Sequence, residues 1–471
     1  MEKGHGVGVR EPLTPEDLTW WYSDQPRQRN TMAMLMLLDR APDPERLRGT
    51  VLRAAELVPR LRQRVVDAPF DLAIPRWERD PTFDLDYHLR RYSLHAGVSA
   101  RDDLAELFRA IGPIYERPFD RTRPLWEIIE IDRPEGRSAL FCRLHHSIAD
   151  GVGANAVLGA LTDADRDGAP LPPPDPEPPG AWPEPRFAER LSQAMRDRIA
   201  DEYDRARGAA GGLLGLARKP ARLLDFARGG QALSEPFMEL STSPPSAYGR
   251  ARRLAGLSVD FEPLRAVRDE LGGRTVEVML TGVAGAMGKW HRHAGRKDVE
   301  SLLTTVPINL RARNAQGLEA GLGNQVTAII MRLPIAERDP RRRFEEIHRT
   351  VEAHRDHPAL DVFPLFSHML ATLPRRVHRA AVLAAQGAMD LIVTNIPGIR
   401  VPRYVGGSEI TAAYPIAPTV PHCPVSIALY GYREQLFIGL DADGTSMTEI
   451  DVFSEMLEEA FAELIELRPG S

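Results

Sequence analysis

The chain lacks any run of about 18 consecutive apolar residues, so the sequence contains no segment that would span a membrane as a helix. Residues 1–10 are glycine-rich and polar, and they lack the apolar stretch of a signal peptide. The only cysteines, Cys142 and Cys423, are too few for a disulfide scaffold and are typical of a reducing compartment. We therefore expect a cytoplasmic protein.

An excess of positive charge is also missing. The formal net charge is −6, which excludes a general electrostatic attraction to nucleic acid. Apolar residues make up 43% and charged residues 27% of the chain, as in an ordinary globular protein. At 471 residues the chain is longer than one hydrophobic core usually serves, so we expect two domains.

Strand and helix patterns alternate in both halves, which predicts an α/β protein with two layered domains. The clearest boundary is residues 165–185, where nine prolines and several acids indicate an extended linker. We expect an N-terminal domain at residues 1–164, a proline-rich linker with connecting helices at 165–235, and a C-terminal domain at 236–471.

Hydrophobic periodicity and capping residues place the main elements. Thr14 before Pro15, and Asp43 before Pro44, are typical helix N-caps. The apolar run at residues 31–38 is too short for most helices, which favours a buried strand. The same reasoning predicts helices at residues 44–58, 104–114, 187–231, 263–271, 276–290, 339–356 and 448–467, and strands at 83–89, 125–131, 141–144, 257–261, 302–310, 325–333, 391–395, 425–432 and 435–441.

The stretch Leu144-His145-His146-Ser147-Ile148-Ala149-Asp150-Gly151 lies where a predicted strand ends. A histidine there is held by a rigid element, and its ordinary pKa of about 6.5 suits proton transfer near pH 7. A structural His–Asp contact would produce the same pattern. A metal site needs a third ligand, and the other histidine clusters, at residues 291–293 and 348–357, lie far away in the sequence.

The pattern His145-His146-x-x-x-Asp150-Gly151 has the HHxxxDG form of the CoA-dependent acyltransferase superfamily. Four further elements resemble those of the bacterial wax ester synthase/diacylglycerol acyltransferase family, in that family's order. They are the "R-PLWE"-like residues 119–127, the "GN-V"-like residues 323–326, the "SNVPG"-like residues 394–398 and the last strand pair at 425–440. The resemblance extends from about Leu13 to Leu467.

This resemblance implies two similar domains with an active-site tunnel at their interface. It implies that His146 is the general base, which takes the proton of a long-chain alcohol or diacylglycerol so that the oxygen attacks the thioester of acyl-CoA. The product would be a wax ester or a triacylglycerol. No acyl-enzyme is needed in this mechanism, so both substrates must be held together. Acyl-CoA is a co-substrate, and we expect no cofactor or metal.

The resemblance also suggests roles for the other motif residues. Asn395, or the Thr394 hydroxyl, would donate a hydrogen bond to the developing oxyanion, although Asn395 could equally be a turn residue before Pro397 and Gly398. His145 would orient its neighbour, Gly151 would form a turn, and Asp150 would be structural, with Arg311 as a candidate salt-bridge partner. The candidate substrate-binding residues are Pro124, Leu125, Trp126, Asn324, Pro397 and Gly398. Pro124, Leu125 and Trp126 could also be pure packing.

The sequence departs from the family pattern at two places. Asn30-Thr31-Met32-Ala33 matches an "NPMH" element without its histidine, and Val276-Glu277 stands where the family has Asn-Asp. Because of these departures, an alternative is that the chain is a catalytically weak protein that binds acyl lipids. The motif is also shared with condensation domains, whose acyl donor is carrier-bound. His145 with Asp150 further fits the HxxxxD of membrane glycerophosphate acyltransferases.

Residues 213–226 interleave leucines with basic side chains, as in segments that lie on a membrane surface. Such a segment would place the protein on the inner face of the membrane or on lipid inclusions. The alternative is that these leucines pack on the protein itself, because Pro220 interrupts any single long helix.

Overall fold

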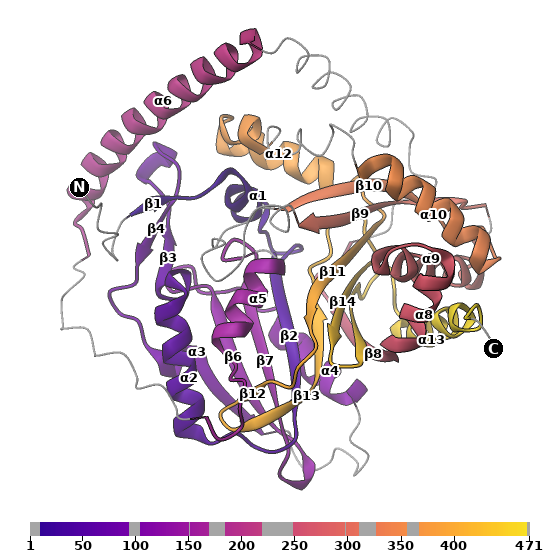
Figure 1. Ribbon diagram of the computed structural model, residues 1–471. Helices are drawn as coiled ribbons and strands as arrows, with labels where there is room; N and C mark the ends of the chain where they lie inside the picture. Colours follow the sequence, from indigo (N-terminus) through magenta and orange to yellow (C-terminus); the bar gives the residue numbers. More distant parts are fainter. Residues whose placement is uncertain are drawn as a thin grey trace.

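The computed structural model describes residues 10–93, 104–149, 151–168, 184–218, 248–296, 298–309, 326–355 and 367–468. Two six-stranded sheets lie next to each other, one mainly from the first half of the chain and one from the second (Figure 1). The chain is therefore an α/β protein with two layered units, as the sequence predicted. A small third sheet of three strands is attached to the first half.

The first sheet has the strand order β12-β13-β2-β7-β6-β5. Its strands are β2 (Thr31–Leu38), β5 (Leu89–Ser93), β6 (Trp126–Asp132), β7 (Ser138–His145), β12 (Tyr404–Val405) and β13 (Ser408–Ile416). The apolar run β2 is buried between two neighbours, which explains why it has no polar face. The predicted pairing of β6 with β7 is confirmed and is antiparallel.

Strand β13 shows that sequence order does not separate the two units. It belongs to the second half of the chain, yet it pairs antiparallel with β2 in the first sheet. It also packs against β14 (Val425–Tyr432) and β15 (Gln435–Asp443) of the second sheet. The two sheets are therefore not divided at the expected domain boundary, residue 236, because residues 404–416 of the second half belong to the first sheet.

The second sheet has the order β10-β9-β11-β14-β15-β8. Its other strands are β8 (Arg252–Asp260), β9 (Ser301–Asn309), β10 (Val326–Pro334) and β11 (Leu391–Ile399). The helices of this half are α8 (Phe261–Leu271), α9 (Thr275–His293), α10 (Pro340–Arg355), α12 (Arg375–Gln386) and α13 (Ile450–Ile465). Buried α9 packs against α10 and α13, and α13 also contacts β8.

The first half carries α1 (Pro15–Ser23), α2 (Pro44–Leu57), α4 (Leu104–Tyr115) and α5 (Gly151–Ala160). Thr14 and Asp43 cap α1 and α2 as predicted. The strand predicted at residues 83–89 is wrong: the Asp84 side chain caps a short helix, α3 (Leu85–His88), and β5 begins only at Leu89. The third sheet contains β1 (Glu11–Pro12), β3 (Gln63–Val66) and β4 (Arg76–Arg79).

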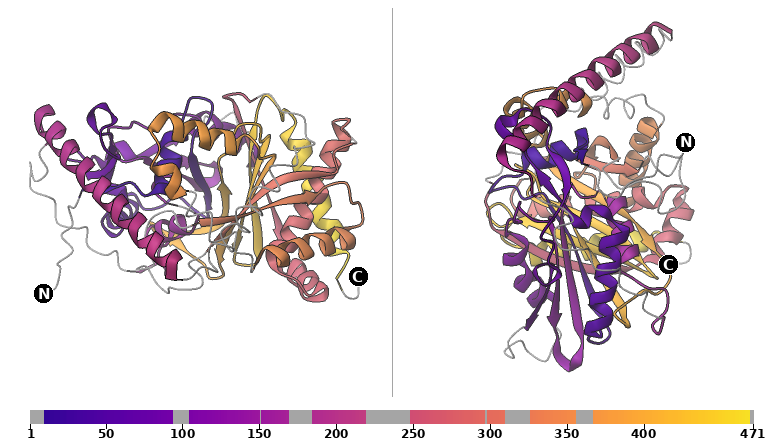
Figure 2. Two further views of the ribbon diagram at one scale, coloured as in Figure 1. Left: turned by 90° about the horizontal axis from the view of Figure 1, so that it is seen from above. Right: turned by 90° about the vertical axis from the view of Figure 1, so that its left-hand side faces the viewer.

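A long helix, α6 (Phe187–Arg218), follows the linker and runs along the outside of the first half (Figure 2). Ion pairs fix its N-terminal part: Arg76 binds Asp197 and Asp201 at 3.0 and 2.8 Å. No helix in the described parts of the chain has both the length and the apolar character that a bilayer crossing requires.

The two halves are joined by a buried polar contact. The Tyr115 hydroxyl on α4 donates to the carbonyl oxygen of Thr31 at 2.7 Å and lies 3.2 Å from Oδ2 of Asp441 on β15. Burial raises the pKa of Asp441 to about 6. The first residue of β2 is therefore tied to the second sheet.

The Val276-Glu277 departure has a structural explanation. Glu277 is fully buried, and its Oε2 accepts hydrogen bonds from the Arg274 backbone N–H at 2.9 Å and lies 2.9 Å from Nδ1 of His348. The carboxylate thus caps the first turn of α9.

Candidate active site

The paired histidines lie at the end of β7, between two other strands. His145 is the last residue of β7, and its backbone N–H donates to the carbonyl oxygen of Leu125 at 2.9 Å. His146 is the next residue, and its N–H donates to the carbonyl oxygen of Asn30 at 2.7 Å. The motif is thus held by main-chain hydrogen bonds on both sides, which positions both imidazoles with respect to the sheet.

His145 is buried and neutral. Its Nδ1 accepts a hydrogen bond from the Ser147 backbone N–H at 3.1 Å and lies 2.7 Å from the Ser147 hydroxyl. The ring proton must therefore be on Nε2. Burial lowers the pKa of His145 to about 4. His145 is 3% exposed, and its orienting role stays a prediction.

We expect His145 to make the protein sensitive to acid. Its pKa is near 6.5 in the unfolded chain and about 4 in the folded one, so the unfolded state binds more protons as the pH falls below 6.5. Stability is then lost on going from pH 7.5 to 5, by about 2 kcal/mol from this group. Urea unfolding at both pH values should show a smaller loss for His145→Asn, whose amide oxygen can still accept from Ser147. An unchanged loss would contradict this prediction.

His146 is the accessible member of the pair. It is half-buried, and its imidazole stacks on the indole of Trp20, with ring centroids 3.8 Å apart and an interplanar angle of 17°. Trp20 is on α1, which lies beside α12 of the second half. A ring fixed in this way has a defined orientation, and because Nδ1 is buried, Nε2 is the nitrogen that would meet a bound substrate.

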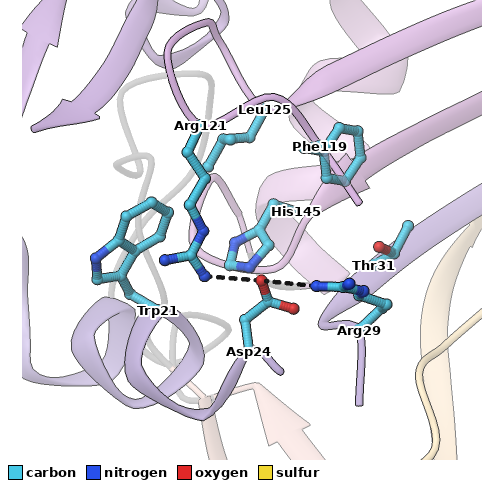
Figure 3. A pocket seen from close by; sticks show the side chains of 8 residues that line it. All are labelled: Trp21, Asp24, Arg29, Thr31, Phe119, Arg121, Leu125 and His145. Carbon is cyan, nitrogen blue, oxygen red and sulfur yellow. Dashed lines mark hydrogen bonds and ion pairs between the residues drawn. The ribbon is translucent and has the colours of Figure 1, made fainter. Parts of the chain in front are cut away.

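A small cavity adjoins His145 and is shown in Figure 3. The Asp24 carboxylate lies between two guanidinium groups, 2.8 Å from Arg121 and 3.6 Å from Arg29. Arg121 also stacks over Trp21 at 4.0 Å. The other lining residues are Thr31, Phe119 and Leu125. These ion pairs lie beside His145 in the wall of the cavity.

Pro124, Leu125 and Trp126 lie in the core. Trp126 is 3% exposed, donates its indole N–H to the Leu61 carbonyl at 2.8 Å and stacks on His88. Leu125 is 1% exposed and supplies the carbonyl that binds His145. The "PLW" element therefore supports the strand end that carries the histidines, and the packing interpretation accounts for its contacts.

The segment with Thr394 and Asn395 comes from β11. The predicted turn at Pro397-Gly398 is wrong, because β11 continues to Ile399 with an irregularity after Ile396. A side chain on Gly398 would meet the backbone oxygen of Gly431 at 1.9 Å, so this position requires glycine. The strand approaches α5, whose Asn155 donates to the Pro397 carbonyl at 2.6 Å. The "SNVPG"-like segment thus lies beside the helix that follows the histidine motif.

The strand period places Thr394 and Asn395 on opposite faces of β11. Thr394 shares a face with Ile396, which packs against the core of the first half. Asn395 shares a face with Val393, which belongs to the core of the second half. Of the two candidate oxyanion donors, Thr394 is therefore the better placed to face the first half.

Several predicted site residues cannot be located. Asp150, Arg311 and Asn324 lie outside the described residues. Gly151 is not in a turn but is the first residue of α5. In the described ranges, no three histidine, cysteine or acidic side chains gather as they would around a metal ion.

Sequence reasoning missed the residues that surround the motif in space. Trp20 and Asp24 belong to no motif found in the sequence, and Arg121 lies in the "R-PLWE"-like residues 119–127 but was not assigned a role. Two signals in the sequence pointed toward this region, the partial match at Asn30 and the "R-PLWE"-like residues 119–127. Neither indicated which residues lie next to the histidines in space.

Comparison with known families matches nearly the whole chain. The model of the wax ester synthase/diacylglycerol acyltransferase catalytic domain matches residues 13–279. The model of the C-terminal domain of the same family matches residues 322–465. The first match includes the histidine motif, and the second includes the later family-like elements.

Individual relatives agree with these matches. A provisionally named diacylglycerol O-acyltransferase of Mycobacterium tuberculosis H37Rv is 29% identical, covering 100% of this chain and 94% of its own. A second such protein of that strain is 28% identical over 92% of this chain and 93% of its own.

Solved structures show the same fold. The wax ester synthase/diacylglycerol acyltransferase from Marinobacter aquaeolei has a TM-score of 0.64 at 20% identity, covering 96% of this chain and 98% of its own. The first condensation domain of the CDA synthetase has a TM-score of 0.60 at 18% identity, covering 98% and 97%. Both comparisons describe the fold, and neither identifies a substrate of this chain.

Proposed function

The chain is an acyltransferase of the wax ester synthase/diacylglycerol acyltransferase family, and we propose that it transfers a fatty acyl group from acyl-CoA to a long-chain alcohol or to diacylglycerol. The products are CoA with a wax ester or a triacylglycerol. The observation that carries the proposal is the contrast between the two histidines. His145 is buried and neutral, whereas His146 is accessible and held in place by a strand end and an indole ring.

In the proposed mechanism His146 accepts the hydroxyl proton of the acceptor as its oxygen attacks the thioester carbonyl carbon. The C–O bond forms, and the carbonyl oxygen becomes an oxyanion, to which the Thr394 hydroxyl or the Asn395 amide donates. The C–S bond then breaks, and the imidazolium of His146 returns the proton to the CoA sulfur. No electron is exchanged, so the reaction requires no redox cofactor.

Analysis of the products identifies the acyl acceptor. Purified protein is given palmitoyl-CoA with hexadecanol in one reaction and with a diacylglycerol in another, and the esters are separated by chromatography. We expect an ester in at least one reaction, and the faster one identifies the acceptor. A reaction that proceeds with an acyl group on a carrier protein but not with acyl-CoA would replace the proposed donor.

We also propose that the enzyme works at a lipid surface through one exposed apolar face. Of the large hydrophobic side chains exposed in the described parts of the chain, eight lie on three adjoining segments. These are Phe70, then Phe187, Met195, Ile199 and Tyr203 on α6, and Met369, Leu373 and Val377 at or near α12. Phe70 contacts Phe187, and Arg375 of α12 pairs with Asp71, so the segments are continuous.

The charge of α12 favours an anionic lipid surface as the partner of this face. The helix contains no acidic residue and three arginines. Arg375 is paired with Asp67 and Asp71, so Arg376 and Arg379 are the ones that would meet a lipid headgroup. Exposed apolar side chains next to arginines are typical of helices that lie in the headgroup region. The segment at 213–226 that the sequence singled out has no described side chains, so its role stays a prediction.

Vesicle co-sedimentation tests the lipid face. We expect Ile199→Asp combined with Val377→Asp to reduce binding to phosphatidylglycerol-containing vesicles about tenfold or more, since each side chain contributes about 1–2 kcal/mol when it leaves water. The matched control is Val401→Asp, which changes an equally exposed valine elsewhere, 57% against 51% for Val377. Equal binding by the double variant and the control would contradict the proposed face.

A further inference from the structure

Asn30 makes four hydrogen bonds at the end of β2, although it is fully buried. Its carbonyl oxygen accepts from the His146 N–H at 2.7 Å. Its side-chain Nδ2 donates to the Trp20 carbonyl at 2.6 Å and to the Ser23 hydroxyl at 2.9 Å. Its Oδ1 accepts from Nε2 of Gln28 at 3.3 Å. One residue therefore contacts both the backbone of His146 and the residue whose ring stacks on it.

The hydrogen bond from the Asn30 side-chain amide to the Trp20 carbonyl caps the C-terminal end of α1. Trp20 is in the last turn of this helix, where carbonyl groups lack a partner within the helix. The Asn30 amide supplies that partner, and it holds the segment from which the indole reaches His146. The imidazole is thus fixed in two ways by the same residue, through its own backbone and through the ring beside it.

The second half of the chain reaches this network through Gln28. Nε2 of Gln28, which donates to Asn30, also donates to Oε1 of Gln386 on α12 at 2.8 Å. On the same helix, His378 packs edge-on against Tyr22 of α1, with ring centroids 5.2 Å apart. The position of α12 is therefore linked to the ring plane of His146.

We propose that Asn30 is a positioning residue, which holds the imidazole of His146 in its reactive orientation by fixing Trp20 and the end of β2 as one unit. This inference rests on the proposed role of His146 as the base. It assigns the asparagine of the partly matched "NPMH" element a task that requires no histidine three residues later. A misplacement of about 1 Å at a reacting group costs up to about 10²-fold in rate.

Steady-state kinetics of Asn30→Ala test the proposal. The variant keeps the backbone bond to His146 and loses the bond to Trp20. We expect kcat to fall about 10- to 100-fold, with the KM for palmitoyl-CoA within about twofold. The matched control is Ser23→Ala, which removes one acceptor of the same amide and leaves the Trp20 bond, and its kcat should stay near that of the wild type. An unchanged kcat in Asn30→Ala would overturn the proposal.

Replacements of Trp20 separate ring packing from general stability. We expect Trp20→Phe to retain most of the activity, because phenylalanine can still stack on the imidazole, and Trp20→Leu to lose about as much kcat as Asn30→Ala. Equal activities of the two Trp20 variants would show that the stacked ring does not position His146.

Fluorescence provides a readout that does not depend on catalysis. The emission of Trp20 is obtained as a difference. The emission of Trp20→Phe is subtracted from that of the wild type, and the emission of the Asn30→Ala, Trp20→Phe double variant from that of Asn30→Ala. Contact with the imidazole should quench the emission of Trp20. We expect Asn30→Ala to increase this difference emission, and an unchanged difference would overturn the positioning role. If His146→Gln proves fully active, the proposed function fails, while the fluorescence still decides whether Asn30 holds the ring pair.

Discussion

Replacing His146 with glutamine is expected to lower kcat/KM by about 10²- to 10⁴-fold, the usual contribution of a positioned general base. Glutamine keeps a polar side chain but cannot accept the proton of the acceptor hydroxyl at neutral pH. The fold should survive, because His146 is only half-buried and its main-chain bond to Asn30 is retained. The rate of CoA release tests the expected loss of activity, and the thermal unfolding midpoint of the same preparation tests whether the fold is intact.

The matched control for this experiment is His293→Gln. His293 is also partly exposed, with 43% of its side chain accessible, but it lies at the end of α9. Its replacement should leave the rate unchanged. If His146→Gln retains more than about a tenth of the wild-type rate, then His146 is not the base, and the contrast between the two histidines loses its catalytic meaning.

Replacing Gly439 with alanine is expected to destabilise the protein by more than about 4 kcal/mol, or to prevent its folding. Gly439 is on β15, where a Cβ atom would lie 1.6 Å from the carbonyl oxygen of Pro415 on β13. The Cβ is fixed to the backbone of β15 and the oxygen belongs to the backbone of β13 in the other sheet, so no side-chain rotation relieves the overlap. The two sheets would have to separate at the point where β13 of the first sheet packs against β15 of the second.

The control for Gly439→Ala is Gly49→Ala. A Cβ on Gly49 meets nothing within 4 Å, and the residue lies inside α2, where alanine is favoured by about 0.5–1 kcal/mol. In urea unfolding, we expect a lower free energy of unfolding than the wild type for Gly439→Ala and a higher one for Gly49→Ala. The soluble yield of Gly439→Ala should also be the lower of the two. A Gly439→Ala protein with wild-type stability would mean that the sheets are not in direct backbone contact there.

Elements with strong local signals were predictable from the sequence. The strand at residues 31–38 has the predicted bounds, because a continuous apolar run of this length with polar residues on both sides is a local signal. The starts of α1 and α2 were also found, since capping by Thr14 and Asp43 depends on residues at most three positions away. Helix caps formed by hydrogen bonds between residues close in the sequence can therefore be predicted from the sequence alone.

Features that depend on distant partners were not predictable. Strand β13 pairs with β2, which lies more than 370 residues earlier in the chain, and nothing near Ser408–Ile416 indicates which sheet it joins. The turn expected at Pro397-Gly398 was wrong because these residues, although typical of turns, occur at an irregularity inside β11. Local propensity was overruled by pairing with β14.

The candidate site shows the same division. The motif identified His145 and His146 from the sequence, and the structure then distinguishes them by burial and by the bonds of Nδ1. Trp20, which stacks on His146, and Asn30, whose amide holds Trp20, both lie more than 100 residues earlier in the chain, on α1 and just before β2. Such contacts form only when α1 packs onto the end of the sheet.

The most direct test of this account is the release of CoA thiol from palmitoyl-CoA, measured with and without an acceptor alcohol. Direct transfer with His146 as base predicts steady release that requires hexadecanol or diacylglycerol and equals the ester formed. Without an acceptor, no thiol should appear. Release of one equivalent per protein without an acceptor would indicate an acyl-enzyme, and no release with either acceptor from folded protein would contradict the proposed reaction.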